Sequence, residues 1–190
     1  YDVKTAVVLA SGDPLFYGIG RWFSKNFAAE QLTFYPAVSS VQAGCHALGW
    51  SLQDVDVLSL HGRPLNKIRR LLQTQQRLAI LTDKHSTPTA LAKECEAVGL
   101  GDSTLWVCEN MGFAEQRIRQ FGVNELLQLD SLDVDPLHIT MIETHGRGLA
   151  QANFPGIADS EYSTGKEAGS GMITKREVRL MVLSFMQPSN

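Results

Sequence analysis

Residues Leu78–Thr82 read LAILT, a short apolar run, and Pro88–Val98 follows it with a helical pattern. A continuous Leu/Ile run of this length is typical of a strand in a sheet that is covered on both faces. Thr87 fits an N-cap, with Pro88 at the first helical position. This segment therefore predicts a strand followed by a helix.

The same alternation extends on both sides of this segment. Further strands are predicted from apolar runs at Thr5–Ala10, Leu32–Tyr35, Val57–Leu60, Thr104–Cys108 and Leu137–Ile142. Further helices are predicted at Phe16–Phe27, Ser39–Leu48, Pro64–Gln73 and Ala114–Gln120. Ser39 with Gln42 fits a capping box, and Gly49 fits the end of that helix. Strands that alternate with helices predict an α/β fold and disfavour all-α and all-β folds.

Composition narrows the class of partner. The chain has 190 residues, 44% of them hydrophobic, with 17 Lys+Arg against 20 Asp+Glu and a net charge of −3. A sequence pI near 5.9 disfavours a general nucleic-acid binder. No apolar run approaches the ~18 residues of a membrane-spanning helix. We therefore expect a soluble protein with no nucleic-acid partner and no membrane association.

The cysteines indicate the compartment. Cys45, Cys95 and Cys108 form an odd, widely spaced set, and each lies in an apolar segment. This usage is typical of a reducing compartment and of small buried hydrophobic side chains. We therefore expect a cytoplasmic location and no role for these thiols in catalysis.

The pattern changes after the last predicted strand. Residues 146–171 are rich in Gly, Ser, Ala and Pro and show no period, which predicts a linker. Thr174–Glu177 then fits a second capping box, followed by an apolar stripe at helical spacing. The stripe consists of Val178, Met181, Val182 and Phe185. It fits the opening of another domain and, equally well, a terminal helix that docks on its own domain.

The sharpest motif is Ser11–Gly18, SGDPLFYG, directly after the predicted strand Thr5–Ala10. Open α/β sheets bind ligands at the carboxyl ends of their strands. Gly12 allows a ligand to approach the backbone. Asp13 and Pro14 fit equally well a structural turn that opens a helix. The glycine spacing matches neither a dinucleotide-binding fingerprint nor a P-loop.

Two further loops join a strand to a helix. Tyr35–Ser40 offers amides and hydroxyls at a helix N-terminus. His61 and Arg63 follow another strand, ahead of a helix on which Lys67 and Arg70 share a face. This basic cluster fits the recognition of carboxylates, and it also fits a solvated helix face.

Metal and hydrolytic sites are not predicted. The five histidines show no zinc-ligand spacing, and Ser39 and Ser40 lack a nucleophile-elbow context. In Cys108–Arg117, after another strand, Asn110 and Met111 fit either the lining of a cleft or a turn. No residue is therefore assigned a catalytic role.

Taken together, four strings of residues resemble the tetrapyrrole (corrin/porphyrin) methylase family. They are Ser11–Gly18, Tyr35–Ser40, His61–Arg63 and Cys108–Arg117, within a similarity that covers Thr5–Glu143. The resemblance implies two α/β/α domains with S-adenosylmethionine (SAM) in the cleft between them, the N-terminal domain being truncated. It divides the chain into the end of a first methylase domain (1–30), a second methylase domain (31–145), a linker (146–171) and the start of a second methyltransferase/decarboxylase module (172–190).

The resemblance also implies a function. We expect SAM-dependent C-methylation of a precorrin at C5 in cobalamin biosynthesis, with C15 methylation and decarboxylation by the linked module. The fragment alone is expected to be inactive, and the protein to be a homo-oligomer such as a dimer. The implied cofactor-binding residues are Gly12, Asp13, Pro14, Phe16, Ser39, Ser40 and Asn110, and the proposed substrate-binding residues are His61, Arg63, Lys67 and Arg70. The alternative is a non-catalytic ligand-binding or assembly module of α/β fold.

Overall fold

The computed structural model describes residues 5–148 and 174–186, without the side chain of Arg70. The chain divides into two compact units, Tyr1–Gly148 and Leu149–Asn190. From residue 149 on, the expected linker lies outside the described residues. So do the first two and the last four residues of the expected second module.

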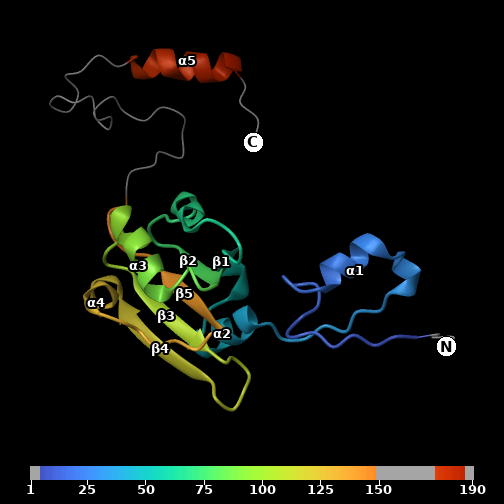
Figure 1. Cartoon of the computed structure of the whole chain (residues 1–190). Helices are drawn as coiled ribbons and strands as arrows, with labels where there is room; N and C mark the ends of the chain where they lie inside the picture. The colour runs from blue at the N-terminus through green and yellow to red at the C-terminus, as the bar shows by residue number, and fades with distance from the viewer. Residues whose placement is uncertain (1–4, 149–173, 187–190) are drawn as a thin grey trace. The chain divides into compact units, whose positions relative to one another are not determined.

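The first unit contains a five-stranded mixed sheet (Figure 1). The strands are β1 (Val55–Ser59), β2 (Arg77–Leu81), β3 (Thr104–Glu109), β4 (Arg117–Gly122) and β5 (His138–Glu143). Their order is β1-β2-β5-β3-β4. β1 and β2 are parallel, whereas β5 runs antiparallel to both β2 and β3. Among the described strands, the last one in sequence therefore lies at the centre of the sheet.

Helices cover both faces of this sheet, as the apolar runs predict. The α-helices of the first unit are α1 (Gly20–Asn26), α2 (Ser40–Leu48), α3 (Pro88–Ala97) and α4 (Val123–Gln128). Short 3₁₀ helices are η1 (Ala29–Gln31), η2 (Leu52–Asp54) and η3 (Leu65–Arg70). The α/β fold class predicted from the sequence is confirmed.

Two apolar clusters hold the layers together. On one face Val41 and Cys45 of α2 pack with Ile139 and Met141 of β5. On the other face α3, α4 and η3 pack with β2, β3 and Ile142 of β5. Because successive side chains of a strand point to opposite faces, β5 contributes to both clusters.

The helix caps form as predicted. Ser39 Oγ accepts the amide of Gln42 at 3.2 Å, and Gln42 Oε1 accepts the amide of Ser39 at 2.9 Å. Gly49 ends α2 in the left-handed region at φ +67°. Thr87 Oγ1 accepts the amide of Ala90 at 3.2 Å, and Pro88 opens α3.

Two predicted strands do not form in the described structure. Thr5–Ala10 and Leu32–Tyr35 have no regular secondary structure, and Val7 and Leu9 are 84% and 93% exposed. A strand requires a neighbour for its backbone hydrogen bonds, and no described strand pairs with either segment. Apolar composition alone did not reveal whether such a neighbour exists.

Two predicted helices are shorter than expected. Within Phe16–Phe27 the helix begins only at Gly20, since Tyr17 adopts φ +55° and the preceding residues form a turn. Within Pro64–Gln73 the helix is the 3₁₀ helix η3. The repeat of three still buries Ile68 completely.

The predicted helix Ala114–Gln120 is wrong, because Arg117–Gly122 forms β4. Arg117 and Arg119 share one face with Phe121, while Ile118 packs against the opposite cluster. This period of two belongs to a strand. The helix that follows this strand, α4, was not predicted.

The second unit contributes α5 (Arg176–Met186) to the described residues. This confirms the helix predicted from the apolar stripe, and the side chain of Phe185 in that stripe is 82% exposed. Its assignment to a further module stays a prediction. No described helix is long and apolar enough to span a membrane.

Candidate functional site

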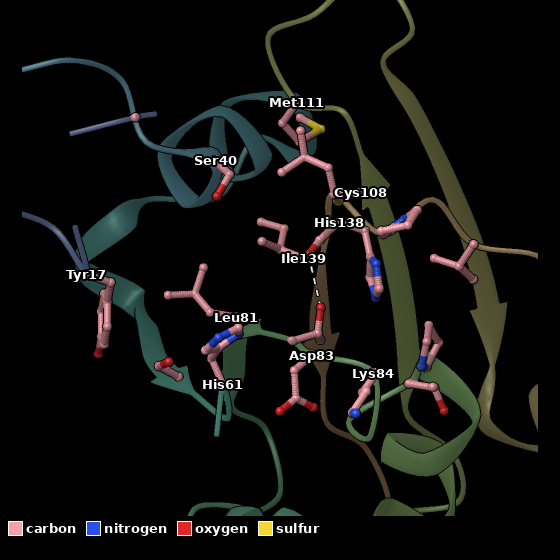
Figure 2. Close-up of a pocket in the computed structure, with 18 of the residues that line it drawn as sticks. Tyr17, Ser40, His61, Leu81, Asp83, Lys84, Cys108, Met111, His138 and Ile139 are labelled. Atoms are coloured by element: carbon pink, nitrogen blue, oxygen red, sulfur yellow. Dashed lines mark hydrogen bonds between the residues drawn. The ribbon is translucent and has the colours of Figure 1, made fainter. Parts of the chain in front are cut away.

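A cavity of about 1750 Å³ opens at one edge of the sheet in the first unit (Figure 2). β1, β2 and β3 end at this edge, and β5 begins there because it runs antiparallel to its neighbours. Residues from 11–17, 38–43, 59–62, 81–89, 108–113 and 129–139 line the cavity. Segments that lie far apart in the sequence thus meet in one site.

Asp13 connects two of the lining loops. Its Oδ1 accepts the amides of Leu15 at 2.8 Å and Phe16 at 3.1 Å. Its Oδ2 accepts the amide of Ala37 at 3.3 Å. The residue that caps α1 is Ile19, with no side-chain cap, so Asp13 is not the helix cap. The carboxylate instead forms the turn after Gly12 and holds it beside the loop that leads into α2.

Gly12 provides close access to the backbone. It adopts φ +65°, and a Cβ at this position meets only Ser39 Cα, at 4.0 Å. The next positive φ in this loop belongs to Tyr17, whose hydroxyl donates to the carbonyl of Val57 at 3.4 Å. The loop is therefore fixed to β1 as well.

The two serines at the start of α2 have different environments. The Ser39 side chain is used by the capping box, and the residue is only 5% exposed. Ser40 points its hydroxyl into the cavity (Figure 2). Ser40 therefore supplies the hydroxyl that can reach a ligand.

Asp83 joins the loops that follow β1 and β2. Its Oδ2 accepts the amide of Gly62 at 3.0 Å, and its Oδ1 accepts the amides of His85 at 2.9 Å and Ser86 at 3.0 Å. Hydrogen bonds from the Gly62 and His85 amides hold the pKa of Asp83 well below its usual range. Figure 2 shows Asp83 between His61 and Lys84 on one side of the cavity.

The charged residues that line the cavity are mostly acidic. They are Asp13, Asp83, Asp130 and Asp133, against Lys84. His61, His85 and His138 add imidazoles to the lining. This distribution favours a cationic group near the carboxylates, and it limits recognition of an anion to the neighbourhood of Lys84.

The cavity brings together six of the residues singled out by sequence: Gly12, Asp13, Phe16, Ser39, Ser40 and His61. Pro14, Asn110, Arg63 and Lys67 do not line it. Arg63 Nη1 instead donates to the Ser59 carbonyl at 3.3 Å. Lys67 lies exposed on η3, and the side chain of Arg70 lies outside the described structure. The binding roles assigned to all these residues stay predictions.

Asn110 acts on the shape of the site from outside it. It adopts φ +50°, and its amide donates to the carbonyl of Leu137 at 2.9 Å. Its side chain hydrogen-bonds Asp135, which together with the Leu137 amide lowers the pKa of that carboxyl. Asn110 therefore connects the loop after β3 to the loop before β5.

Met111 lines the cavity, which was one of the two alternatives that the sequence left open for it. Lys84, His85 and His138 also line the cavity, but the sequence did not predict them as site residues. A usable signal was present, because Lys84 and His85 follow the predicted strand Leu78–Thr82. His138 lies at the start of another predicted strand.

Neither a thiolate nor a metal-binding cluster is found at this site among the described residues. Burial, with smaller contributions from Cys45 and Glu109, raises the pKa of Cys108 to about 12, which leaves it a protonated thiol near neutral pH. All three cysteines are free and buried, as predicted. Among residues 5–148 and 174–186, no group of three or more His, Cys, Asp or Glu is placed to hold a metal ion.

Comparison with known proteins defines the class. Residues 1–127 match the model of the Tetrapyrrole (Corrin/Porphyrin) Methylases. The chain belongs to this family. It shares the fold of uroporphyrin-III C-methyl transferase from Thermus thermophilus complexed with S-adenyl homocysteine. That match has a TM-score of 0.54 and 15% identity, and it covers 70% of this chain and 60% of the other.

Curated relatives are more specific. The chain is 37% identical to a precorrin-6Y C(5,15)-methyltransferase [decarboxylating] from Sinorhizobium sp over 183 residues, 96% of this chain and 43% of the relative. It is 36% identical to a cobalt-precorrin-7 C(5)-methyltransferase from Salmonella typhimurium, over 64% of this chain and 59% of the relative. The chain therefore spans less than two thirds of the length of these relatives.

Proposed function

We propose that the first unit binds SAM in the cavity and takes part in methylation of a precorrin at C5 in cobalamin biosynthesis. The observation that carries this proposal is the junction of the Ser11–Tyr17 loop with the start of α2 through Asp13. Membership of the methylase family and the names of the relatives support the reaction class. No described feature favours the alternative of a non-catalytic module.

The lining residues fit SAM. Gly12 leaves its backbone accessible, Ser40 offers a hydroxyl, and the acidic lining suits a cationic sulfonium. SAM supplies a methyl group already activated for transfer, so the residues of the chain need only bind and orient the reactants and exclude water. Such positioning accounts for about 7 to 11 kcal/mol of barrier reduction in well-oriented systems.

Substitution of Asp13 tests the SAM proposal. Asp13→Ala removes the acceptor of three loop amides, so we expect SAM affinity to fall by about 10-fold, equivalent to one hydrogen bond to a charged group. Isothermal titration of SAM into the chain measures this effect. Asp102→Ala, an exposed carboxylate that does not line the cavity, is the matched control. A folded wild-type chain without saturable SAM binding contradicts the proposed function.

The substrate side of the proposal shifts to a different lysine. A precorrin carries several carboxylates, and Lys84, with His61 and His85 nearby, is the basic group that the cavity offers them. Lys67 does not line the cavity. We therefore propose Lys84, rather than Lys67, as the partner of a substrate carboxylate.

A matched pair of variants separates the two lysines. We expect Lys84→Gln to weaken binding of a polycarboxylate tetrapyrrole such as uroporphyrin III by about 10-fold, because a charge-assisted hydrogen bond is lost. Lys67→Gln should leave that affinity unchanged, and both variants should keep the wild-type affinity for SAM. Fluorescence titration measures the tetrapyrrole affinity. The reverse order of effects would restore the assignment made from the sequence.

The C15 methylation and decarboxylation are proposed for a linked module, because the Sinorhizobium relative is named a C(5,15)-methyltransferase [decarboxylating]. The homo-oligomeric state is inferred from the family alone. The cytoplasmic location is supported by three free, buried cysteines.

A further inference from the structure

Glu109 is a buried carboxylate with an unusually complete set of partners. The residue ends β3, and its side chain is 1% exposed. Arg117 donates to it through Nε and Nη2, both at 2.8 Å, and Arg119 through Nε and Nη2, both at 3.1 Å. The amide of Asp135 donates to Glu109 Oε1 at 2.9 Å. Glu109 thus connects β3, β4 and the loop before β5.

Asp135 passes this constraint to the cavity. Glu109 holds its amide, and its own carboxylate accepts the Leu137 amide at 2.8 Å and a hydrogen bond from the Asn110 side chain. The carbonyl oxygen of Asp135 lies 2.7 Å from His138 Nδ1. The hydrogen bonds of the Asp135 amide and of the Asp135 carboxylate therefore fix the position of the Asp135 carbonyl that contacts the imidazole.

This contact selects one form of the imidazole. A carbonyl oxygen can only accept a hydrogen bond, so Nδ1 of His138 carries the proton. In the neutral ring, Nε2 then has a lone pair and no hydrogen. Nε2 is buried and has no hydrogen-bond partner among the described residues. The same is true of Thr140 Oγ1, two residues further along β5. Buried acceptors rarely remain unpaired in a functioning protein.

We propose that Glu109 is a positioning residue for His138. It holds Asp135 so that the carbonyl retains the proton on Nδ1, which leaves Nε2 as a hydrogen-bond acceptor. Because Nε2 is buried, an N–H or O–H donor of the molecule bound in the cavity reaches it only when the residues that cover it shift. Figure 2 shows His138 on the β5 side of this cavity, away from Tyr17. The identity of that molecule rests on the proposed function, whereas the selection of the tautomer does not.

The test reads the tautomer directly and requires no ligand. In ¹⁵N NMR spectra of the full chain, imidazole nitrogen shifts distinguish a protonated Nδ1 from a protonated Nε2, and His138→Gln assigns the resonances. We expect the neutral ring of wild-type His138 to be the Nδ1–H form. A wild-type ring that carries its proton on Nε2 overturns the proposal without any variant.

Variants then test the role of Glu109. Glu109→Asp keeps a negative charge for the two arginines but withdraws it from the Asp135 amide, so the neutral ring should become a mixture of both tautomers. Glu109→Gln should do the same, and either variant suffices if the other does not fold. Glu143→Gln, which removes the carboxylate paired with Arg77 at the other end of β5, is the matched control and should keep the Nδ1–H form. Retention of that form in a folded Glu109 variant contradicts the positioning role.

Discussion

Replacing Glu109 with Gln is expected to lower the free energy of unfolding by about 3 kcal/mol, because the buried carboxylate loses its charge-assisted hydrogen bonds while the two arginines keep part of their side chains in solvent. The change leaves Arg117 and Arg119 without the carboxylate that both contact, and it disturbs the acceptor of the Asp135 amide. Chemical denaturation followed by circular dichroism measures the loss. It is the largest stability effect that we expect from a single polar substitution here.

The same effect should depend on pH. Burial raises the pKa of Glu109, but hydrogen bonds from Arg117, the Asp135 amide and Arg119 outweigh it and hold the pKa at about 2, below its ordinary value of 4.5. Because the folded pKa is the lower one, the stabilisation is complete above pH 4.5 and is lost as the pH falls towards 2. The depression corresponds to about 3 kcal/mol. The difference between wild type and Glu109→Gln should therefore shrink within that window.

Glu143 supplies the control for both measurements. Its pair with Arg77 has side chains that are 27% and 37% exposed, so Glu143→Gln should cost less than about 1 kcal/mol. Equal losses for the two variants, or a Glu109 effect that does not change between pH 4.5 and 2, would contradict the buried ionised state.

The second large effect concerns Gly18. A Cβ at this position lies 2.5 Å from the Pro14 carbonyl oxygen and 2.8 Å from that of Asp13. Both are backbone atoms, so Gly18→Ala must open the loop that carries Gly12 and Asp13 into the cavity. We expect SAM affinity to fall by more than about 10-fold, because misplacement by an ångström at a binding site carries penalties of that order.

The sheet should tolerate this change, since the loop contributes no strand to it. Gly122→Ala is the matched control, because a Cβ there meets nothing within 4 Å and the residue has an ordinary φ of −76°. Titration of SAM into both variants, with thermal unfolding monitored in parallel, separates loss of binding from loss of fold. Wild-type SAM affinity in Gly18→Ala contradicts the placement of this loop at the SAM site.

Local chemistry explains which elements were predictable. The capping box of Ser39 and the Thr87-Pro88 start depend on neighbouring residues only, and both form. The strand Arg117–Gly122 depends on Glu109, whose burial requires both arginines on one face. That pairing is set by tertiary contact, so the sequence window around residues 114–120 misled the prediction.

The site was predictable to a similar degree. The loop motifs located Gly12, Asp13 and Ser40 in the cavity, although the two strands expected before these loops do not form. Lys67 and Arg63 were chosen because basic residues cluster there in sequence, but the turn of the chain after β1 directs them elsewhere. Lys84 enters the cavity because Asp83 fastens its loop to Gly62, a contact between segments 21 residues apart. No pattern within one segment encodes such a contact.

The central position of β5 has a consequence for assembly during synthesis. β2 and β3 are joined only through β5, which lies between them. Without His138–Glu143, the β1-β2 pair and the β3-β4 pair are therefore separate ribbons with open edges. Open edges invite pairing with other chains. A nascent chain must therefore emerge from the ribosome beyond residue 143 before its two ribbons can be joined, and until then each is exposed to aggregation.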